Sequence, residues 1–352
     1  MDKHAPFQLP SFSGLERLPA ALLPWYAQNA RALPWRADRQ PYRVWLSEVM
    51  LQQTRAGAVR GYYLRFLEAL PTLANLAEVE EGRLFKLWEG LGYYSRVRNL
   101  QKAARIIMAE HGGVFPRQYE QVRALPGIGD YTAGAICSIC FELPTAAVDG
   151  NVLRCVARLE DIGQAMDTPP MKRAVAAALS AVYPPGNCGD FTQSLMELGA
   201  TVCLPGSKPR CTDCPAQSFC KAHAAGRAGE LPLLTSKRPR KAEERTVFLL
   251  AHEGRLALCQ RPDKGLLAGL WQFPNVSGAL GPQEALAQAA AWGAEPIAPE
   301  QALSRTHVFT HLEWQMTAYR IRCGMAAPAF VWATPAELSE TYALPTAFRQ
   351  FL

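Results

Sequence analysis

A turn with two closely spaced glycines lies between two predicted helices in the middle of the chain. Residues 117–125 form a helical pattern, Gly127 and Gly129 follow, and a second helix is predicted to begin at Asp130 or Tyr131. Glycine lets the backbone turn tightly with no side chain projecting, so the amides of the turn and of the next helix can face a phosphate. The segment predicts a helix-hairpin-helix motif, although an ordinary helix corner capped by Asp130 fits the same residues.

The composition is that of an ordinary globular protein. Of the 352 residues, 49% are hydrophobic and 19% are charged, which disfavours disorder. No apolar run approaches the roughly 18 residues of a membrane span, and the first residues lack a signal-peptide pattern, so we expect a cytoplasmic protein with no membrane partner. A net charge of +6 is compatible with a polyanionic partner but does not require one.

Glu48 lies on a predicted long helix that covers residues 42–70. Trp45, Leu51 and Gln52 are three or four positions away and therefore share its face. A lone carboxylate among such neighbours is more often an ordinary surface residue than a functional one.

Ten cysteines without an export signal indicate thiols or metal ligands in preference to disulfides. Four of them fall within eighteen residues with the spacing C-x7-C-x2-C-x5-C, which suits either zinc or a [4Fe–4S] cluster and favours the cluster. These four are Cys203, Cys211, Cys214 and Cys220. A C-x2-C pair, Cys137 and Cys140, lies in an apolar helical pattern, where free cysteines commonly act as small core residues.

The sequence pattern changes after a proline-rich and charged linker at 226–244. Short strand patterns and one helical pattern follow, which predict a small α/β domain.

Seven stretches together form one pattern. They are residues 33–36 (LPWR), 45–54 (WLSEVMLQQT), 90–94 (GLGYY), 125–136 with the hairpin, 148–152 (VDGNV), 203–220 with the four cysteines, and 308–311 (VFTH). The pattern covers nearly the whole chain and resembles the adenine DNA glycosylases of the MutY type, in the helix-hairpin-helix DNA glycosylase superfamily.

This resemblance implies a mainly α fold with a C-terminal α/β Nudix-like domain. The implied parts are a six-helix barrel with the helix-hairpin-helix at 30–138, an iron–sulfur cluster subdomain from 1–29 and 139–225, a linker at 226–244, and a domain at 245–352 that recognises 8-oxoguanine. It also implies a [4Fe–4S] cluster on the four cysteines. The implied partner of the monomer is double-stranded DNA with adenine opposite 8-oxoguanine, bound at the nucleoid.

Two carboxylates suffice for the chemistry that the resemblance implies. Cleavage of the N-glycosidic bond to adenine needs an acid for the leaving base and an anion for the sugar cation. By resemblance, Glu48 protonates adenine N7 and helps to activate water, while Asp149 stabilises the cation or bonds to it transiently. Tyr131 and Asn151 orient these groups. Burial among apolar neighbours should raise the pKa of Glu48 above its reference of about 4.3.

The target base must leave the stack before it can react. By resemblance, Gln53 and Tyr93 fill or wedge the duplex beside 8-oxoguanine, and Leu51 assists. The further residues that the resemblance places against DNA or the lesion are Arg36, Gly127, Gly129, Phe309, Thr310 and His311. Thr310 stands where the family usually has serine, which keeps the hydroxyl and adds a methyl group.

Position 131 separates two related activities. Endonuclease III-like enzymes carry a lysine there, which forms a Schiff base with the sugar. Tyr131 therefore predicts a monofunctional glycosylase that leaves an abasic site. The alternatives are a pyrimidine-lesion glycosylase and lyase of the same fold, and a non-enzymatic iron–sulfur protein that binds DNA.

Two further features qualify the resemblance. A working Nudix hydrolase needs a glutamate-rich motif for magnesium, and residues 275–295 hold only Glu284 and Glu295, so the domain should recognise and not hydrolyse. The first cysteine gap is seven residues where the family usually has six, which a bulge at Gly206 would absorb.

Overall fold

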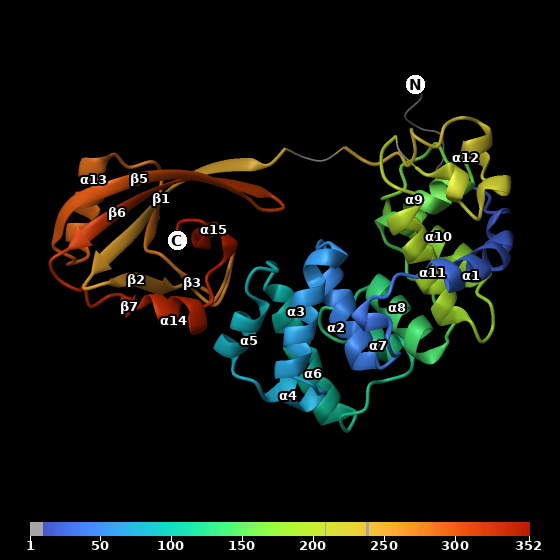
Figure 1. Ribbon diagram of the computed structural model, residues 1–352, viewed down its shortest axis with the longest axis horizontal. Coiled ribbons are helices and arrows are strands. Elements are labelled where there is room, and N and C mark those ends of the chain that lie inside the picture. Colours follow the sequence, from blue (N-terminus) through green and yellow to red (C-terminus); the bar gives the residue numbers. More distant parts are fainter. Residues whose placement is uncertain (1–9, 208, 237–238) are drawn as a thin grey trace. The chain divides into compact units, whose positions relative to one another are not determined.

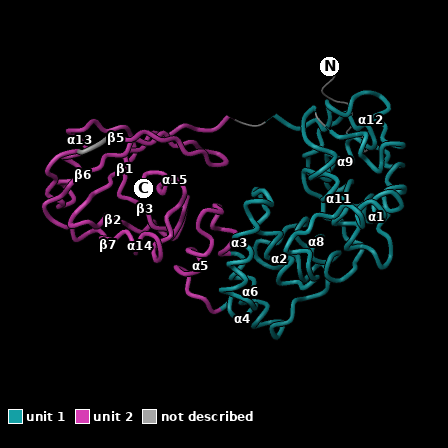
Figure 2. Tube along the Cα trace, viewed as in Figure 1, with its two compact units in different colours: residues 1–77, 99–236 teal, residues 78–98, 237–352 magenta. Residues whose placement is uncertain are grey.

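The structure is a computed structural model that describes residues 10–207, 209–236 and 239–352. The first nine residues of the predicted cluster subdomain and residues 237–238 of the predicted linker lie outside this set. The chain forms two compact units, unit 1 with residues 1–77 and 99–236 and unit 2 with residues 78–98 and 237–352 (Figure 2). Within the described ranges, none of the helices combines the length and apolar character needed to cross a bilayer.

Unit 1 is helical (Figure 1). Its elements are η1 (Leu15–Arg17), α1 (Leu18–Asn29), η2 (Pro34–Arg36), α2 (Pro41–Leu51), α3 (Ala56–Ala69), α4 (Leu73–Glu78), most of α6 (Ser95–Glu110), α7 (Tyr119–Ala124), α8 (Asp130–Phe141), α9 (Gly150–Leu159), α10 (Pro169–Ser180), α11 (Cys188–Thr201), η3 (Cys211–Asp213), η4 (Gln217–Phe219) and α12 (Lys221–Ala224).

The prediction of one long helix over residues 42–70 is wrong. The structure has two helices, α2 and α3, separated by residues 52–55. Gln53 has a left-handed backbone with φ of +58°, which cannot continue a right-handed helix. The break leaves Gln53 exposed at a corner between the two helices.

Helices α2 and α8 pack side by side in unit 1. Val44 of α2 lies in one buried cluster with Ala135 and Ile139 of α8. Residues four apart on a helix share a face, so Glu48 follows Val44 on α2 and Tyr131 precedes Ala135 on α8 at the same contact. This packing brings together two side chains that are 83 positions apart in the sequence.

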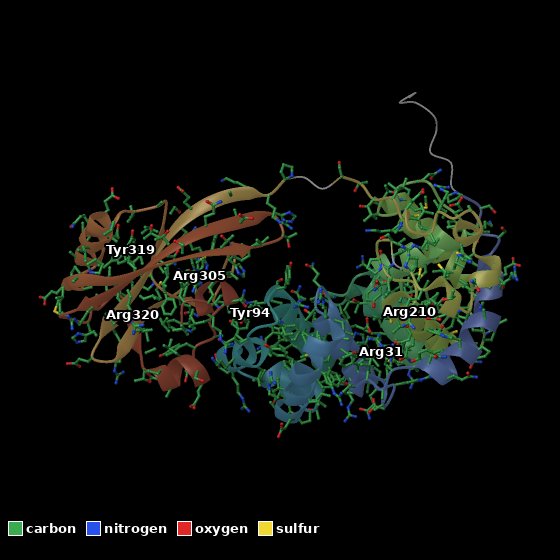
Figure 3. The ribbon with its side chains drawn as sticks, turned by 45° about the horizontal axis from the view of Figure 1, so that its top comes forward. Arg31, Tyr94, Arg210, Arg305, Tyr319 and Arg320 are labelled. Carbon is green, nitrogen blue, oxygen red and sulfur yellow. The ribbon has the colours of Figure 1, made fainter. Side chains whose placement is uncertain are left out.

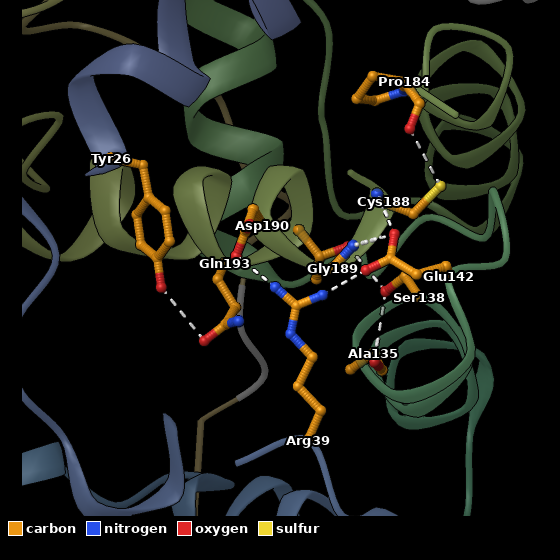
Figure 4. Close-up of polar contacts among 11 residues, drawn as sticks. Tyr26, Arg39, Ala135, Ser138, Glu142, Pro184, Cys188, Gly189, Asp190 and Gln193 are labelled. Carbon is orange, nitrogen blue, oxygen red and sulfur yellow. Dashed lines mark hydrogen bonds and ion pairs between the residues drawn. The ribbon is translucent and has the colours of Figure 1, made fainter. Parts of the chain in front are cut away.

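A carboxylate at the end of α8 holds the start of α11 (Figure 4). Glu142 accepts hydrogen bonds from the backbone amides of Cys188 (2.6 Å) and Gly189 (3.3 Å). Arg39 bonds to Glu142 and also to Asp190 at 2.8 Å. Because α11 forms one wall of the pocket described below, these contacts fix part of the candidate site.

Unit 2 contains a mixed sheet. Its strands are β1 (Lys241–His252), β2 (Arg255–Gln260), β3 (Trp271–Gln272), β4 (Asn275–Ser277), β5 (Pro296–Val308), β6 (Leu312–Cys323) and β7 (Val331–Ala333), and its helices include α13 (Pro282–Ala291), α14 (Pro335–Glu340) and α15 (Thr346–Arg349). The order is β3-β2-β1-β6-β5, with β4 paired to β1 and β7 to β2, and β1 runs parallel to β6. One face packs against α13, and the other packs against α14 and α15.

Residues 78–98 join this sheet in one compact unit, although the sequence assigned them to the barrel. They contain α5 (Glu81–Trp88) and the loop 89–94, and the boundary with unit 1 falls within α6. Lys86 Nζ donates to the carbonyls of Leu338 (3.1 Å) and Tyr342 (3.3 Å), and Glu89 accepts from the amide of Leu344 at 2.8 Å. The sequence-based domain boundaries thus remain a prediction, and the contacts group this segment with the C-terminal residues.

Candidate active site

A pocket of about 830 Å³ in unit 1 is lined by both predicted carboxylates. Glu48 comes from α2, Tyr131 from α8, and Asp149 and Asn151 from the beginning of α9. Of the residues predicted to contact DNA, Arg36, Leu51 and Gln53 also line it. Folding therefore brings two acids that are a hundred positions apart into one cavity.

Glu48 is buried and only 5% exposed. Burial raises its pKa from 4.5 to about 7, and the nearby Asp149 adds to the shift. The Tyr131 hydroxyl donates to Glu48 Oε2 at 2.7 Å and lowers the pKa in part, since this bond stabilises the charged form. The predicted rise is confirmed, so a large fraction of Glu48 carries a proton at neutral pH.

Asp149 caps the N-terminus of α9. Its Oδ1 accepts from the backbone amides of Asn151 (2.9 Å) and Val152 (2.8 Å), and its Oδ2 accepts from Asn151 Nδ2 at 2.8 Å. The positive end of the helix and three donors stabilise a carboxylate in this position. The site therefore holds one acid that favours its proton and one anion fixed in orientation.

Arg154 supports Asn151 from behind, and sequence reasoning missed it. Its Nη2 donates to Asn151 Oδ1 (2.9 Å) and to the carbonyl of Gly199 (2.8 Å), and its Nε donates to the carbonyl of Cys203 at 2.8 Å. This one side chain links the pocket to the first cysteine of the loop. The sequence offered one indication of this role, because Arg154 lies among the residues of α9 that are buried.

Arg36 forms an ion pair with a buried acid, Glu197. Its Nη2 lies 2.7 Å from Glu197 Oε2, and Arg31 Nε lies 2.5 Å from Glu197 Oε1. Burial alone would raise the pKa of Glu197, but the two arginines hold it below its usual value. Arg36 thus lines the pocket with its charge neutralised on one side, and sequence reasoning also missed Glu197.

The hairpin forms between α7 and α8. Gly127 has φ of +77°, and a Cβ there would lie 2.7 Å from Asn99 Cβ, so this position requires glycine. Gly129 has an ordinary φ of −93° and open space around its Cα, so the turn itself does not require glycine there. Asp130 begins α8 but does not cap it, because its carboxylate pairs with Arg123 at 2.5 Å.

The four clustered cysteines surround one small cavity, to which Cys155 of α9 also contributes. Arg158 Nη1 donates to Cys203 Sγ at 3.3 Å and to the carbonyl of Leu204 at 2.7 Å, while its Nη2 donates to Gly206 at 2.9 Å. A hydrogen bond from Cys155 and the charge of Arg158 lower the pKa of Cys203. Gly206 is left-handed with φ of +71°, and the bulge there stays a prediction.

These thiols are spread around the cavity. Within the described residues, no three His, Cys, Asp or Glu side chains converge on a point that would hold a single metal ion. Cys137 and Cys140 lie on α8, away from this cavity, as predicted.

Four of the residues predicted to contact DNA or the lesion lie in unit 2, namely Tyr93, Phe309, Thr310 and His311. Tyr93 is left-handed with φ of +46° and 46% exposed, and its hydroxyl is 3.1 Å from Thr310 Oγ1. Thr310 and His311 are exposed at the tip of the turn between β5 and β6. Phe309 instead packs inward, edge-on to Trp314 at 4.9 Å between ring centroids.

Two family models match the chain. One is described as "HhH-GPD superfamily base excision DNA repair protein" and matches residues 46–185, and the other is a NUDIX domain that matches residues 246–352. They confirm the helical glycosylase fold and the C-terminal Nudix-like α/β domain.

Similar proteins extend over most of the chain. The adenine DNA glycosylase of Rattus norvegicus is 37% identical over 366 residues, which is 88% of this chain and 71% of the rat protein. That of Homo sapiens is 35% identical over 397 residues, 94% of this chain and 72% of the human protein.

Solved structures share the helical fold. A thermostable thymine-DNA glycosylase matches with a TM-score of 0.56 and 26% identity, over 60% of this chain and 98% of that protein. A non-covalent endonuclease III–DNA complex matches with a TM-score of 0.51 and 22% identity, over 60% of this chain and 97% of its own, a similarity of fold alone.

Proposed function

The chain belongs to the adenine DNA glycosylases, which are DNA N-glycosylases of base excision repair, and from this premise we propose that it excises adenine paired with 8-oxoguanine or guanine in duplex DNA. The observation that carries the proposal is the buried Glu48, with its pKa near 7, in one pocket with Asp149 and Tyr131. An acid poised near neutral pH beside a fixed anion matches the demands of base excision.

The proposed reaction uses the two acids in turn. Glu48 gives its proton to N7 of the extruded adenine, and the C1′–N9 bond breaks with its electron pair going to the base. Asp149 faces the cation that remains on the sugar, and Asn151 holds its carboxylate in orientation. A water molecule then adds to C1′ and returns a proton to Glu48, which restores the enzyme.

Tyr131 supports a monofunctional enzyme. Its hydroxyl is buried and donates to Glu48, and burial raises its pKa far above the ordinary value, so it stays a neutral donor and no nucleophile. A phenol cannot form a Schiff base with the sugar as a lysine amine does. The product is an abasic site with an intact strand.

Unit 2 takes the role of lesion recognition in this proposal. Tyr93 and Thr310 present neighbouring hydroxyls on an exposed surface, and His311 lies beside them. Residues 275–295 hold only two glutamates, and the carboxylate of Glu284 accepts from the amide of Gly281 at 2.7 Å and caps α13. The domain would thus bind the modified base without hydrolysing a nucleotide.

We propose that the four cysteines hold a [4Fe–4S] cluster. The donor set fits, since all four thiols face one cavity and Arg158 supplies a hydrogen bond to a ligand sulfur. The cluster would fix the loop between α11 and α12. We further propose that the protein acts as a monomer on chromosomal DNA in the cytoplasm. No step of the excision depends on it.

A substrate panel tests the proposal. Purified protein is incubated with duplexes that carry adenine opposite 8-oxoguanine, adenine opposite guanine, or thymine glycol, and products are resolved with and without alkali. We expect adenine release from the first two and strand breaks only after alkali. Release from the thymine glycol duplex, or strand breaks without alkali, would support the pyrimidine-lesion lyase instead.

A further inference from the structure

The sheet of unit 2 brings two arginines to one buried ring. Arg245 lies on β1 and Arg261 directly follows β2. Their guanidinium carbons lie over the Trp314 ring, 4.3 and 5.8 Å from its centroid. Trp314 is only 1% exposed, so both cations rest against the interior of the domain.

Among the described residues, the side-chain and backbone groups that accept hydrogen bonds from these two cations are neutral. Arg245 Nη1 donates to Asn275 Oδ1 and Arg261 Nη1 donates to Gln272 Oε1, both at 2.6 Å. Arg261 Nε donates to the carbonyl of Leu266 at 2.8 Å. The buried Nε of Arg245 finds no acceptor in the part of the chain that the structure describes.

Glu243, two positions before Arg245 on β1, balances this charge only in part. Its charge raises the pKa of Arg245, but it also pairs with Lys241 Nζ at 3.1 Å. Burial lowers the pKa of Arg245, and burial together with the charge of Arg245 lowers the pKa of Arg261. Two like charges held partly out of water cost free energy until an anion joins them.

The position of Arg245 and Arg261 in the domain indicates which anion they bind. Trp314, under the two guanidinium groups, packs edge-on against Phe309 at the base of the turn that carries Thr310. Arg245 and Arg305 lie opposite the same residue of β6, so they share a face of the sheet. Arg305 is exposed on β5 (Figure 3).

We propose that Arg245 and Arg261 form a phosphate-binding site of unit 2, which takes a backbone phosphate of the DNA strand that the 309–312 turn reads. Planar guanidinium groups bind phosphate oxygens in pairs, which suits two arginines with donors to spare. The proposed function is needed only to identify the DNA strand, and the two-arginine site itself does not depend on it. Inorganic phosphate or a free nucleotide offers the same chemistry, and the experiment separates these sources.

The test uses the full chain with Arg245→Gln and Arg261→Gln as single changes. Arg255→Gln is the matched control, because Arg255 is exposed at the start of β2 in the same unit. Binding to a duplex with adenine opposite 8-oxoguanine is measured over a salt series in a Glu48→Gln background, which prevents turnover. Loss of one phosphate contact reduces the slope of log K against log salt concentration by about 0.9.

We expect this reduction in both arginine variants and an unchanged slope in the control. If slopes stay the same while sodium phosphate, compared with chloride at equal ionic strength, raises the melting temperature of wild type but not of the variants, a free phosphate is the ligand and the DNA assignment is wrong. If neither quantity responds, the site does not exist.

Melting temperatures show whether a change in DNA binding comes from loss of folding. Arg245→Gln removes one of two like charges but also the contact with Trp314 and the hydrogen bond to Asn275, so the melting temperature of each variant without ligand is measured first to show that it is folded in the binding assay. Arg261→Lys keeps the charge without the planar fork and should keep the salt slope while binding more weakly. Adenine release by wild type is scored separately, so a failure of the proposed function would be visible there and not in the slope.

Discussion

Replacement of Glu48 by glutamine is expected to stop adenine release and, above neutral pH, to stabilise the protein. Burial raises the pKa of Glu48 from 4.5 to about 7, so between these values the unfolded chain ionises the carboxyl while the folded chain keeps it neutral. A shift of this size corresponds to about 3 kcal/mol of lost stability. The loss is absent well below pH 4.5, where both states are neutral, and complete above pH 7.

Glutamine isolates this effect because it keeps an oxygen for the Tyr131 hydroxyl but has no proton to give. Urea denaturation from about pH 4 to about pH 8, followed by tryptophan fluorescence, gives the free energy of unfolding at each pH. The advantage of the variant over wild type should grow from pH 4.5 to 7 and then level off. Single-turnover assays on the adenine·8-oxoguanine duplex measure the chemistry.

Glu110→Gln is the matched control for the stability series, since Glu110 is exposed on α6 in the same unit. We expect no advantage for this control at any pH and full adenine release. A Glu48→Gln protein that is no more stable than wild type at pH 8 would refute the burial argument. Persistent adenine release would refute the assignment of Glu48 as the acid.

Three further predictions concern the hydrogen bond, the hairpin and the loop. Tyr131→Phe removes a bond that lowers the pKa of Glu48, so the alkaline limb of the pH profile of adenine release should move up by about one pH unit, and a limb that stays in place would contradict it. Gly127→Ala should lower the melting temperature because of its left-handed φ, whereas Gly129→Ala should leave melting nearly unchanged and weaken duplex binding in fluorescence anisotropy. Cys214→Ser should lower bound iron and visible absorption after anaerobic purification, and wild-type iron content would contradict its role as a ligand.

The raised pKa of Glu48 was accessible from the sequence. Three of its four neighbours at three and four positions are apolar, namely Val44, Trp45 and Leu51, and a carboxyl on such a helical face must lose water when that face packs. The helical class and the α/β domain followed from periodicity and from resemblance. Apolar neighbours and periodicity are local properties of the chain, so these predictions needed no knowledge of contacts between distant residues.

The break at Gln53 was not accessible in the same way. No proline or glycine interrupts residues 51–55, and each of these residue types is tolerated within helices, so local propensity favours continuity. The structure imposes a left-handed residue there in spite of that propensity. Such a residue persists only where surrounding contacts enforce it.

Arg154 and Glu197 illustrate a second kind of miss. Each is a charged residue buried within a helix, and its meaning depends on partners that are distant in sequence, Cys203 for Arg154 and Arg31 for Glu197. A buried charge costs free energy unless it is paired, so each implies a partner. The sequence alone does not say which of 37 basic residues pairs with Glu197, or that Arg154 binds backbone carbonyls and not one of the 31 acidic residues.

The grouping of residues 78–98 with the C-terminal domain carries a functional consequence. Tyr93 belongs to the barrel by its place in the chain, but its unit also contains Thr310, and the two hydroxyls lie 3.1 Å apart. Lys86 and Glu89 bind backbone groups of the C-terminal residues, which fixes α5 and the loop that follows it. Tyr93 and Thr310, which we propose to read the lesion, are thus held together within unit 2, while both proposed catalytic acids belong to unit 1. Substitutions in α5 that break its contacts to the C-terminal residues should therefore impair lesion discrimination and leave the pKa of Glu48 unchanged.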